Sequence, residues 1–288
     1  EYRFDTIEHA DRLAASWGDF NNDGYPDLFL GNAVQSELYK NNGNGTFSNI
    51  TESAGFEMSC EKCYIAGALW LDYDLDGYLD IFLSDYNQIS PNKLYRNLGD
   101  ETFQQIELTD YIENSNSFSA IPIYANDDMY PDIYIANDFD QFNQLLINQE
   151  GQGFIEMAVE YGVEDPFDGM GLTTCDFNND LSLDFFVTNI KENSLYTKET
   201  SNTSFAYTNY SVEANLYDTD WAWGVTFSDF NHDGFEDFYV ANGFFNPEND
   251  RFFVNDSGNN FTYSDFSGNP PLMSKSRSVN SFDYDNDG

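Results

Sequence analysis

The side chains with the clearest chemical potential lie in a nine-residue segment that recurs along this chain. Positions 1, 3, 5 and 9 of the segment carry Asp or Asn, and position 6 is Gly in three of the four complete copies. The complete copies occupy residues 19–27, 72–80, 176–184 and 229–237. Calcium takes about six to eight oxygen ligands from carboxylates, amides and backbone carbonyls. Oxygen-bearing side chains at alternate positions around a tight turn therefore predict a repeated calcium-binding loop.

We expect each loop to bind its ion through the side chains at positions 1, 3, 5 and 9 and through the backbone carbonyl at position 7. The lack of His and Cys favours calcium over zinc or copper, and the strict octahedron of magnesium suits such a loop less. The expected ligands are Asp19, Asn21, Asp23, Tyr25 and Asp27; Asp72, Asp74, Asp76, Tyr78 and Asp80; Asp176, Asn178, Asp180, Ser182 and Asp184; Asp229, Asn231, Asp233, Phe235 and Asp237; and, in a partial copy, Asp283, Asp285 and Asp287.

The copies are unequal, and their differences predict an order of affinity. Loop 72–80 has four Asp ligands and should bind most tightly. In loop 176–184, Leu181 stands where Gly is expected, which should weaken binding moderately because Gly tolerates strained backbone conformations. A degenerate copy at 124–132 has Tyr124 at position 1 and Met129 at position 6. We expect this third loop to be weak or empty, with Tyr124 filling the space.

Two other interpretations of the segment deserve comparison. An EF-hand begins with the same pattern but requires a bidentate Glu at position 12, between two helices. Position 12 here holds Leu30, Leu83, Val187 or Val240, and no helical periodicity flanks the loops. The other alternative is a turn rich in Asp and Asn that binds no metal. It is disfavoured because unfilled carboxylates at this spacing would repel one another.

The loops are embedded in a regular pattern of apolar runs. The first positions of six copies fall at residues 19, 72, 124, 176, 229 and 283, so the repeat length is 52 to 54 residues. Each loop lies between two short runs rich in β-branched and aromatic residues, as in 68–70 and 80–83, and a Gly/Asn turn separates two further runs. Such runs predict strands, and four short antiparallel strands per repeat predict an all-β β-propeller of four-stranded blades.

We expect a single propeller domain over residues 1–288. Five complete repeats and two fragments do not close a ring of six or seven blades, so we expect the ring to continue beyond both ends. In such blades the cation loops share one face with the turns between strands three and four, and the variable loops occupy the opposite face. The repeats are expected at about 14–56, 66–106, 118–160, 171–210 and 222–266, with partial blades at 1–13 and 279–288.

The composition limits the classes of partner. The chain has 51 acidic and 11 basic side chains, a formal net charge of −40, which argues against nucleic acids and anionic membranes. Aromatic residues make up 18% of the chain, too many for a disordered acidic segment. No apolar run approaches the ~20 residues of a membrane span. The chain begins at Glu1 without a signal peptide, so we expect a mature or excised segment.

The cysteines and the glycosylation sequons are compatible with an oxidising compartment but do not establish one. Cys60 and Cys63 form one C-x-x-C without a second pair or a nearby His, which favours a local disulfide over zinc. Cys175 is expected to be a small buried hydrophobe. The N-x-S/T sequons permit glycosylation without demonstrating it, since so Asn-rich a chain produces several by chance. They begin at Asn44, Asn49, Asn202, Asn209, Asn255 and Asn260.

The tandem motif, with Leu-Tyr-x-Asn and Gly-Thr-Phe between its copies, resembles the FG-GAP/VCBS repeat. The phrases at 17–27 and 45–56 are similar to the cartilage acidic protein branch of that family. The resemblance covers essentially the whole chain. It implies the calcium-bearing, usually seven-bladed propeller found in integrin α chains, so this chain is expected to be part of a seven-bladed ring. It also implies an extracellular or cell-surface location as a secreted adhesion protein.

No catalytic constellation stands out, and we expect this protein not to be an enzyme. His9 and His232 have no evident partner, and no nucleophile elbow, zinc-protease motif or phosphate loop occurs. A glycosidase-like carboxylate pair stays open on spacing alone, but the regular acids are already assigned to cations.

The expected function is an adhesion, assembly or protein-interaction module, with a lectin-like carbohydrate binder as the alternative. The protein or glycan ligand should bind on the face opposite the calcium loops, and self-assembly stays open. Trp17 and Trp70, directly before their loops, are expected in the core. Exposed aromatic side chains anchor ligands, and the candidates are Tyr86, Phe142, Trp221, Phe244 and Phe245.

Overall fold

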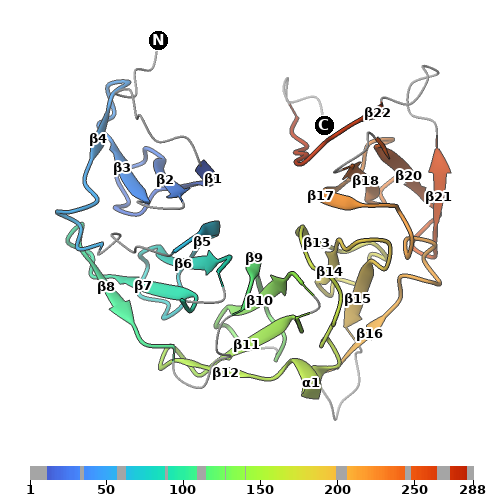
Figure 1. Cartoon of the computed structure of the whole chain (residues 1–288), viewed down its shortest axis with the longest axis horizontal. Coiled ribbons are helices and arrows are strands. Elements are labelled where there is room, and N and C mark those ends of the chain that lie inside the picture. Colours follow the sequence, from blue (N-terminus) through green and yellow to red (C-terminus); the bar gives the residue numbers. More distant parts are fainter. Residues whose placement is uncertain are drawn as a thin grey trace. The chain divides into compact units, whose positions relative to one another are not determined.

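The computed structural model is all-β, with five four-stranded antiparallel sheets and a single four-residue helix among the described residues (Figure 1). The expected all-β class with four-stranded antiparallel blades is confirmed. The chain divides into two compact units, Glu1–Ile135 with Leu146–Glu156, and Ala136–Leu145 with Met157–Gly288. The structure describes residues 12–32, 36–56, 63–87, 90–108, 115–126, 128–139, 141–198, 206–243, 248–264 and 273–283.

The first unit contains two complete sheets and most of a third, each with its strands in sequence order. The first sheet consists of β1 (Arg12–Gly18), β2 (Asp27–Asn32), β3 (Glu37–Asn41) and β4 (Phe47–Asn49). The second consists of β5 (Ile65–Leu71), β6 (Asp80–Asp85), β7 (Lys93–Asn97) and β8 (Phe103–Ile106). The third consists of β9 (Ser117–Ile123), β10 (Asp132–Asn137), β11 (Gln144–Asn148) and β12 (Phe154–Glu156).

The second unit contains the helix, two further sheets and a strand pair. The helix is α1 (Ala158–Tyr161), and a left-handed Gly162 ends it. The fourth sheet consists of β13 (Leu172–Cys175), β14 (Asp184–Val187), β15 (Ser194–Lys198) and β16 (Tyr207–Asn209). The fifth consists of β17 (Ala222–Ser228), β18 (Asp237–Asn242), β20 (Arg251–Asn255) and β21 (Phe261–Ser264), and β19 (Glu248–Asn249) pairs with β22 (Met273–Ser274).

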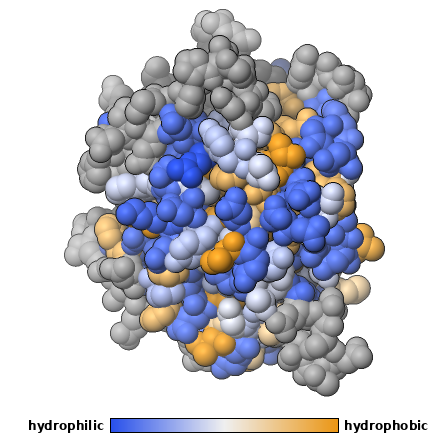
Figure 2. Space-filling model, turned by 90° about the vertical axis from the view of Figure 1, so that its right-hand side faces the viewer, coloured by the Kyte–Doolittle hydropathy of each residue, from blue (hydrophilic) through white to orange (hydrophobic). Residues whose placement is uncertain are grey.

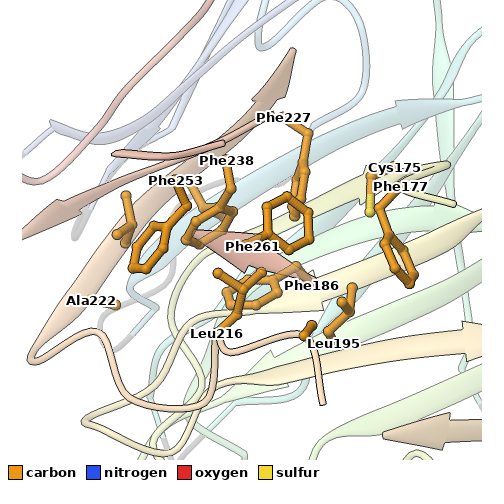
Figure 3. Close-up of a cluster of buried hydrophobic side chains, with 13 residues drawn as sticks. Cys175, Phe177, Phe186, Leu195, Leu216, Ala222, Phe227, Phe238, Phe253 and Phe261 are labelled. Carbon is orange, nitrogen blue, oxygen red and sulfur yellow. The ribbon is translucent and has the colours of Figure 1, made fainter. Parts of the chain in front are cut away.

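Hydrophobic cores lie between the first and second sheets, the second and third, and the fourth and fifth. Every residue of β2, β6, β10 and β14 is buried, so the second strand of each of these sheets is covered on both faces. In the second unit, Phe186 of the fourth sheet packs against Phe227 and Phe238 of the fifth, at ring distances of 6.0 and 4.8 Å (Figure 3). Cys175 lies in the same cluster, free and buried, as the sequence predicts. A sheet of this kind therefore buries its apolar faces only against its neighbours.

The tryptophans before the first two loops differ, and the prediction that both lie in the core is wrong for Trp17. Trp70 of the second sheet stacks on Phe20 at 6.2 Å and packs beside the core between the first two sheets. Trp17, at the matching position of the first sheet, is 56% exposed and contacts Phe47 edge-on at 6.0 Å. The reason is positional, because Trp70 faces a neighbouring loop whereas Trp17 meets only its own sheet among the described residues.

Candidate cation-binding loops

Each acidic loop joins the first two strands of a sheet and is closed by an equivalent strand pair. The residue before each loop pairs with the Asp at position 9, as Leu71 does with Asp80 and Ser228 with Asp237. The other complete loops close in the same way, through Gly18 with Asp27 and Cys175 with Asp184. The four loops therefore begin and end at the same point of the blade.

Inside each loop, the first carboxylate accepts hydrogen bonds from the backbone of the turn. In loop 72–80, Asp72 accepts from the backbone N–H groups of Asp76 and Gly77 at 3.0 and 2.9 Å. The carboxylate of Asp76 then accepts from the N–H of Tyr78 at 3.0 Å. The equivalent acceptors, with distances of 2.8–3.1 Å, are Asp19 and Asp23, Asp176 and Asp180, and Asp229 and Asp233.

The backbone is left-handed at positions 4 and 6 of each complete loop. At position 6, Gly24, Gly77 and Gly234 have φ of 86°, 90° and 93°, a region open to Gly but costly for other residues. Leu181 adopts φ of 67° at this position and leaves its side chain 93% exposed. Loop 176–184 thus keeps the common path despite the substitution, at a backbone cost. Position 4 residues Asn22, Leu75, Asn179 and His232 all have φ of 58–59°.

The Asp at position 9 is fully buried and holds the loop against the third strand. Asp80 accepts hydrogen bonds from the N–H groups of Tyr73 in the loop, at 3.0 Å, and of Asn97 at the end of β7, at 2.7 Å. Asp237 makes the matching pair with Phe230 at 3.2 Å and Asn255 at 2.9 Å. The sequence predicts only that the position-9 Asp is a cation ligand. Its second role, as a hydrogen-bond acceptor that fixes the loop, depends on the third strand ending beside the loop.

Burial raises the pKa of these position-9 carboxyl groups. The pKa of Asp27 rises to about 6, that of Asp80 to about 7 and that of Asp184 to about 8, mainly because the charged form loses its hydration. Repulsion from other acids of the same loop adds to this effect. Both carboxylate oxygens of Asp184 are buried without a well-formed hydrogen bond, although nearby N–H groups of Lys198 and Phe177 partly lower its pKa. A bound cation would offset this uncompensated charge.

Loop 72–80 brings three carboxylates together in a way that fits a calcium ion. Oxygens of Asp72, Asp74 and Asp80 lie within 4.8 Å of one another. Oxygens that each lie about 2.3–2.6 Å from a shared ion are separated by at most ~5 Å, so this spacing fits. One buried oxygen of Asp74, Oδ1, has no hydrogen-bond partner among the described residues.

A protein cation already faces this second loop. Arg96 of β7 places Nε 2.6 Å from Asp74 Oδ2 and Nη2 3.2 Å from Asp76 Oδ2. Lys40 has the same place in β3 but forms its ion pair with Glu101 instead. Arg96 is not among the residues predicted from the sequence. Its place at the variable position of Leu-Tyr-x-Asn, directly before Asn97, could have indicated a side chain near the loop.

The degenerate third loop keeps the position-9 contact and loses the first carboxylate. Asp132 is buried and accepts from the N–H groups of Ala125 and Asn148, both at 2.8 Å. Tyr124, at position 1, is 48% exposed, and the carboxylate that the complete loops have at this position is absent. The position-9 Asp can therefore hold the loop on the sheet even where position 1 does not supply a carboxylate ligand.

The aromatic residues expected to bind a partner have different surroundings. Phe142 is 53% exposed, whereas Tyr86 packs between Tyr64 and Phe118, at ring distances of 5.8 and 5.5 Å. Trp221 is half-buried and bridges to Ile190 by backbone pairing. Phe244 and Phe245 lie outside the described residues.

A hollow of about 270 Å³ lies in the second unit, among residues from the end of the fifth sheet away from its acidic loop. It is lined by Asp220, Asn249, Arg251 and Tyr263. Arg251 forms an ion pair with Asp220, so these charges largely cancel. Tyr263 is 49% exposed beside them. None of these four residues was predicted from the sequence as part of a binding site.

One expected glycosylation site is wrong. Asn255 is buried, and its Nδ2 donates to the carbonyls of Phe177 and Glu236 at 2.8 and 3.0 Å, so it cannot carry a glycan in this fold. Asn44, Asn49 and Asn209 are exposed, and Asn260 is partly buried. Asn202 lies outside the described residues.

Cys63 is buried and disulfide-bonded. Its expected partner, Cys60, lies outside the described residues. In the partial sixth loop Asp283 is exposed, while Asp285 and Asp287 also lie outside the described residues.

The comparisons with known proteins agree with this architecture. The FG-GAP-like repeat model matches residues 19–62 and 176–240, which include three of the four complete loops. No curated protein matches this sequence. The described part of the chain contains no helix long and apolar enough to cross a membrane.

Two solved structures share the fold at low sequence identity. One is an Agrocybe aegerita lectin that specifically recognises non-reducing terminal N-acetylglucosamine, with a TM-score of 0.54, 15% identity, and coverage of 90% of this chain and 68% of the lectin chain. The other is the V. cholerae biofilm matrix protein Bap1, with a TM-score of 0.51, 15% identity, and coverage of 94% of this chain and 43% of that chain. The family match and the repeated acidic loops on four-stranded sheets show that this chain contains FG-GAP-like repeats, at residues 19–62 and 176–240, on propeller-type blades.

Proposed function

We propose that this chain is a calcium-stiffened binding module that acts outside the cell in adhesion, assembly or ligand capture, and not as an enzyme. The observation that carries the proposal is the repeated loop geometry. Four loops share the same turn hydrogen-bonded to the position-1 carboxylate, and each has a buried Asp at position 9. Calcium supplies positive charge where burial otherwise penalises the ionised carboxylates.

The ligand residues of each loop have different structural roles. Asp72 orders the turn by accepting its N–H groups, and Asp80 ties the loop to the third strand. Both keep lone pairs that could bind an ion, because each carboxylate oxygen can accept more than one contact. A bound ion would therefore add to an arranged loop rather than create it.

An extracellular location suits such sites. Calcium modules outside the cell work with dissociation constants of roughly 10⁻⁴–10⁻³ M, because the ion is abundant there. The net charge of −40 also favours cation uptake and keeps copies of the protein apart.

The ligand is proposed to bind at the sheet ends away from the acidic loops. Phe142 is exposed at the end of the third sheet, and exposed aromatic side chains are common anchors in protein interfaces. A protein partner is therefore the first candidate.

A carbohydrate ligand is the second candidate, and the hollow beside Tyr263 favours it. An aromatic ring next to a hydrogen-bonding Arg–Asp pair suits a sugar ring and its hydroxyl groups. Because the ion pair is locally neutral and the whole chain is strongly acidic, a neutral saccharide fits better than an anionic one.

Thermal unfolding with and without EDTA tests the calcium proposal. At about 100 times its dissociation constant, an ion stabilises the folded state by roughly 2.7 kcal/mol per site, so chelation should lower Tm by several degrees. Asp233→Asn should remove one ion from the stoichiometry measured by calorimetry. Asp128→Asn, at the same position of the degenerate third loop, should not. An unchanged Tm in EDTA together with no calorimetric binding would overturn the proposal.

A glycan array separates the two ligand classes. Binding of neutral sugars that Tyr263→Ala abolishes supports the carbohydrate ligand. An empty array, with retained folding, leaves the protein partner as the proposed ligand.

A further inference from the structure

Three of the four complete acidic loops are each tied to the repeat that follows by an asparagine side chain. Asn97, at the end of β7 in the second sheet, donates its side-chain Nδ2 to the carbonyl of Phe20 at 2.8 Å, across 77 residues of sequence. Phe20 directly follows the first ligand position of loop 19–27. The same Nδ2 donates to the carbonyl of Leu79 in loop 72–80 at 3.0 Å.

The backbone of Asn97 completes the connection. Its N–H donates to Oδ1 of Asp80, the ninth residue of loop 72–80, at 2.7 Å. One residue therefore contacts loop 19–27 through its side chain and loop 72–80 through both side chain and backbone, and the backbone contact is with the ligand residue Asp80. A shift of either loop changes the environment of Asn97, and through it the other loop.

The same arrangement recurs in the second unit. Asn255 donates to the carbonyls of Phe177 and Glu236 at 2.8 and 3.0 Å, and its N–H donates to Asp237 at 2.9 Å. Asn148 repeats the pattern between the second and third sheets, with Tyr73 at 2.8 Å and Pro131 at 3.1 Å. The recurrence in both units shows that this contact is part of the repeat.

A second link runs directly from loop to loop. Asn22, at position 4 of the first loop, donates Nδ2 to the carbonyl of Gly77 at 2.9 Å. Asn179 makes the same bond to Gly234 at 2.8 Å. The peptide unit that carries the Gly77 carbonyl also carries the N–H of Tyr78, which donates to Asp76. The neighbouring loop therefore helps to orient the peptide that precedes the position 7 carbonyl.

A third contact brings a turn of the next sheet onto the loop. A Cβ added at Gly151, in the turn between β11 and β12, would lie 2.9 Å from Cβ of Asp74. A Cβ at Gly258 would lie 2.9 Å from Cα of Asn178. The third position of each of these loops is thus packed against the following repeat.

We propose that adjacent acidic loops within a unit bind cations cooperatively, with Asn97 and Asn255 as positioning residues shared by two loops. This inference rests on the proposed function, because it concerns the same ion sites. An ion in one loop orders the carbonyl that Asn97 or Asn255 holds, and the same asparagine then presents its N–H to the position-9 carboxylate of the next loop. The second ion meets a loop that is already ordered, so its binding costs less conformational entropy.

Calcium titration calorimetry of the whole chain tests the coupling through a paired comparison. Asp72→Asn weakens the second loop, and we expect it to lower the calcium affinity of the first loop by about fivefold or more, a usual size for coupling between sites. In an Asn22→Ala background the same change should have a smaller effect on the first loop. Asn22 is exposed, so its removal should leave the fold intact. Asn97→Ala should reduce the coupling further.

The control is His232→Ala, which changes position 4 of the fifth loop, where no bond to a following loop occurs among the described residues.

A second measurement needs no calcium. In EDTA, Asn22→Ala should speed amide hydrogen exchange at Gly77 and Tyr78, and His232→Ala should not. Calcium binding with equal, independent affinities and unchanged exchange in Asn22→Ala would overturn the coupling alone. The absence of any calcium binding would overturn the proposed function as well.

Discussion

At the residue scale, position 6 of the loop shows how a backbone requirement is met in different ways. Gly24, Gly77 and Gly234 have nothing within 4 Å of an added Cβ, so space does not explain the preference for glycine. The cause is φ near 90°, which a side chain disfavours. Leu181 tolerates a similar conformation at φ of 67°, with its side chain in solvent. It therefore contributes strain without compensating burial.

Leu181→Gly should stabilise the protein. The left-handed conformation costs a non-glycine residue roughly 1–2 kcal/mol, and Leu181→Gly removes this cost. Glycine loses more backbone freedom on folding, which destabilises the folded state by about 0.5–1 kcal/mol and offsets part of the gain. We expect a net gain of up to about 1 kcal/mol, a Tm increase of roughly 2 °C in calorimetry, and tighter calcium binding in loop 176–184. The reciprocal Gly234→Leu should lower Tm by a similar amount. A lower Tm for Leu181→Gly would contradict this account of the strain.

Arg96 is a second case in which one side chain changes the expected chemistry of a loop. Loop 72–80 has the most carboxylates, yet its Asp74 and Asp76 are already paired with a guanidinium. That guanidinium would compete with a bound metal ion for these two carboxylates. The order of loop affinities predicted by counting Asp residues therefore omits a competitor.

Arg96→Gln should raise the calcium affinity of loop 72–80 several-fold and lower the Tm measured in EDTA, because the competing cation and its ion pairs are both lost. Calorimetric titration and thermal unfolding measure the two effects. Lys40→Gln is the matched control, since Lys40 pairs with Glu101. Equal calcium affinity in Arg96→Gln and the parent chain would show that the guanidinium does not compete.

At the scale of elements, the position-9 carboxylate fastens each acidic loop to the third strand. Its burial keeps its pKa raised, to about 7 in Asp80 and about 8 in Asp184. In the unfolded chain these groups titrate near the ordinary value of 3.8. Between these values the folded protein binds more protons than the unfolded chain, so stability without metal falls as pH rises.

In EDTA, Tm should therefore rise when the pH is lowered from about 8 to about 5, through the pKa values of Asp80 and Asp184. With calcium the trend should weaken or reverse, because the ion binds the charged carboxylates and the calcium-dependent gain in Tm grows with pH. Thermal unfolding across this range measures both slopes. Asp184→Asn should flatten the dependence in EDTA. A Tm in EDTA that falls steadily on acidification would contradict the assignment.

At the scale of the whole molecule, the surface is dominated by acidic and polar groups. The face in Figure 2 is mainly hydrophilic, with apolar residues scattered among polar ones. With a net charge of −40, the folded chain repels itself as well as anionic partners. Cations can relieve this repulsion in two ways, by general screening and by binding in the loops.

Salt separates these two effects. In EDTA, raising sodium chloride from about 0.1 M to about 1 M shortens the screening length from ~10 Å to ~3 Å and should raise Tm. Calcium at far lower ionic strength should raise Tm further, because it occupies specific sites. If calcium and sodium chloride gave equal Tm at equal ionic strength, screening alone would account for the effect.

The sequence by itself determined the repeat, the strand order within each sheet and the shape of the acidic loops. These features depend on local chemistry, namely turn residues, alternating oxygen side chains and short apolar runs. The all-β fold and the burial of Cys175 followed from such patterns. The left-handed backbone at Leu181 was likewise evident from the missing glycine.

Only the tertiary structure decided which polar groups lose water and which distant residues meet. The motif predicts the same role, that of a cation ligand, for Asp72 and Asp80. Only Asp80 is fully buried, because the end of β7 covers it. Asn97 reaches a carbonyl 77 residues earlier in the chain, and Trp17 stays exposed where Trp70 does not. Burial and contacts of this kind depend on how neighbouring sheets pack, and no local pattern of residue types encodes that packing.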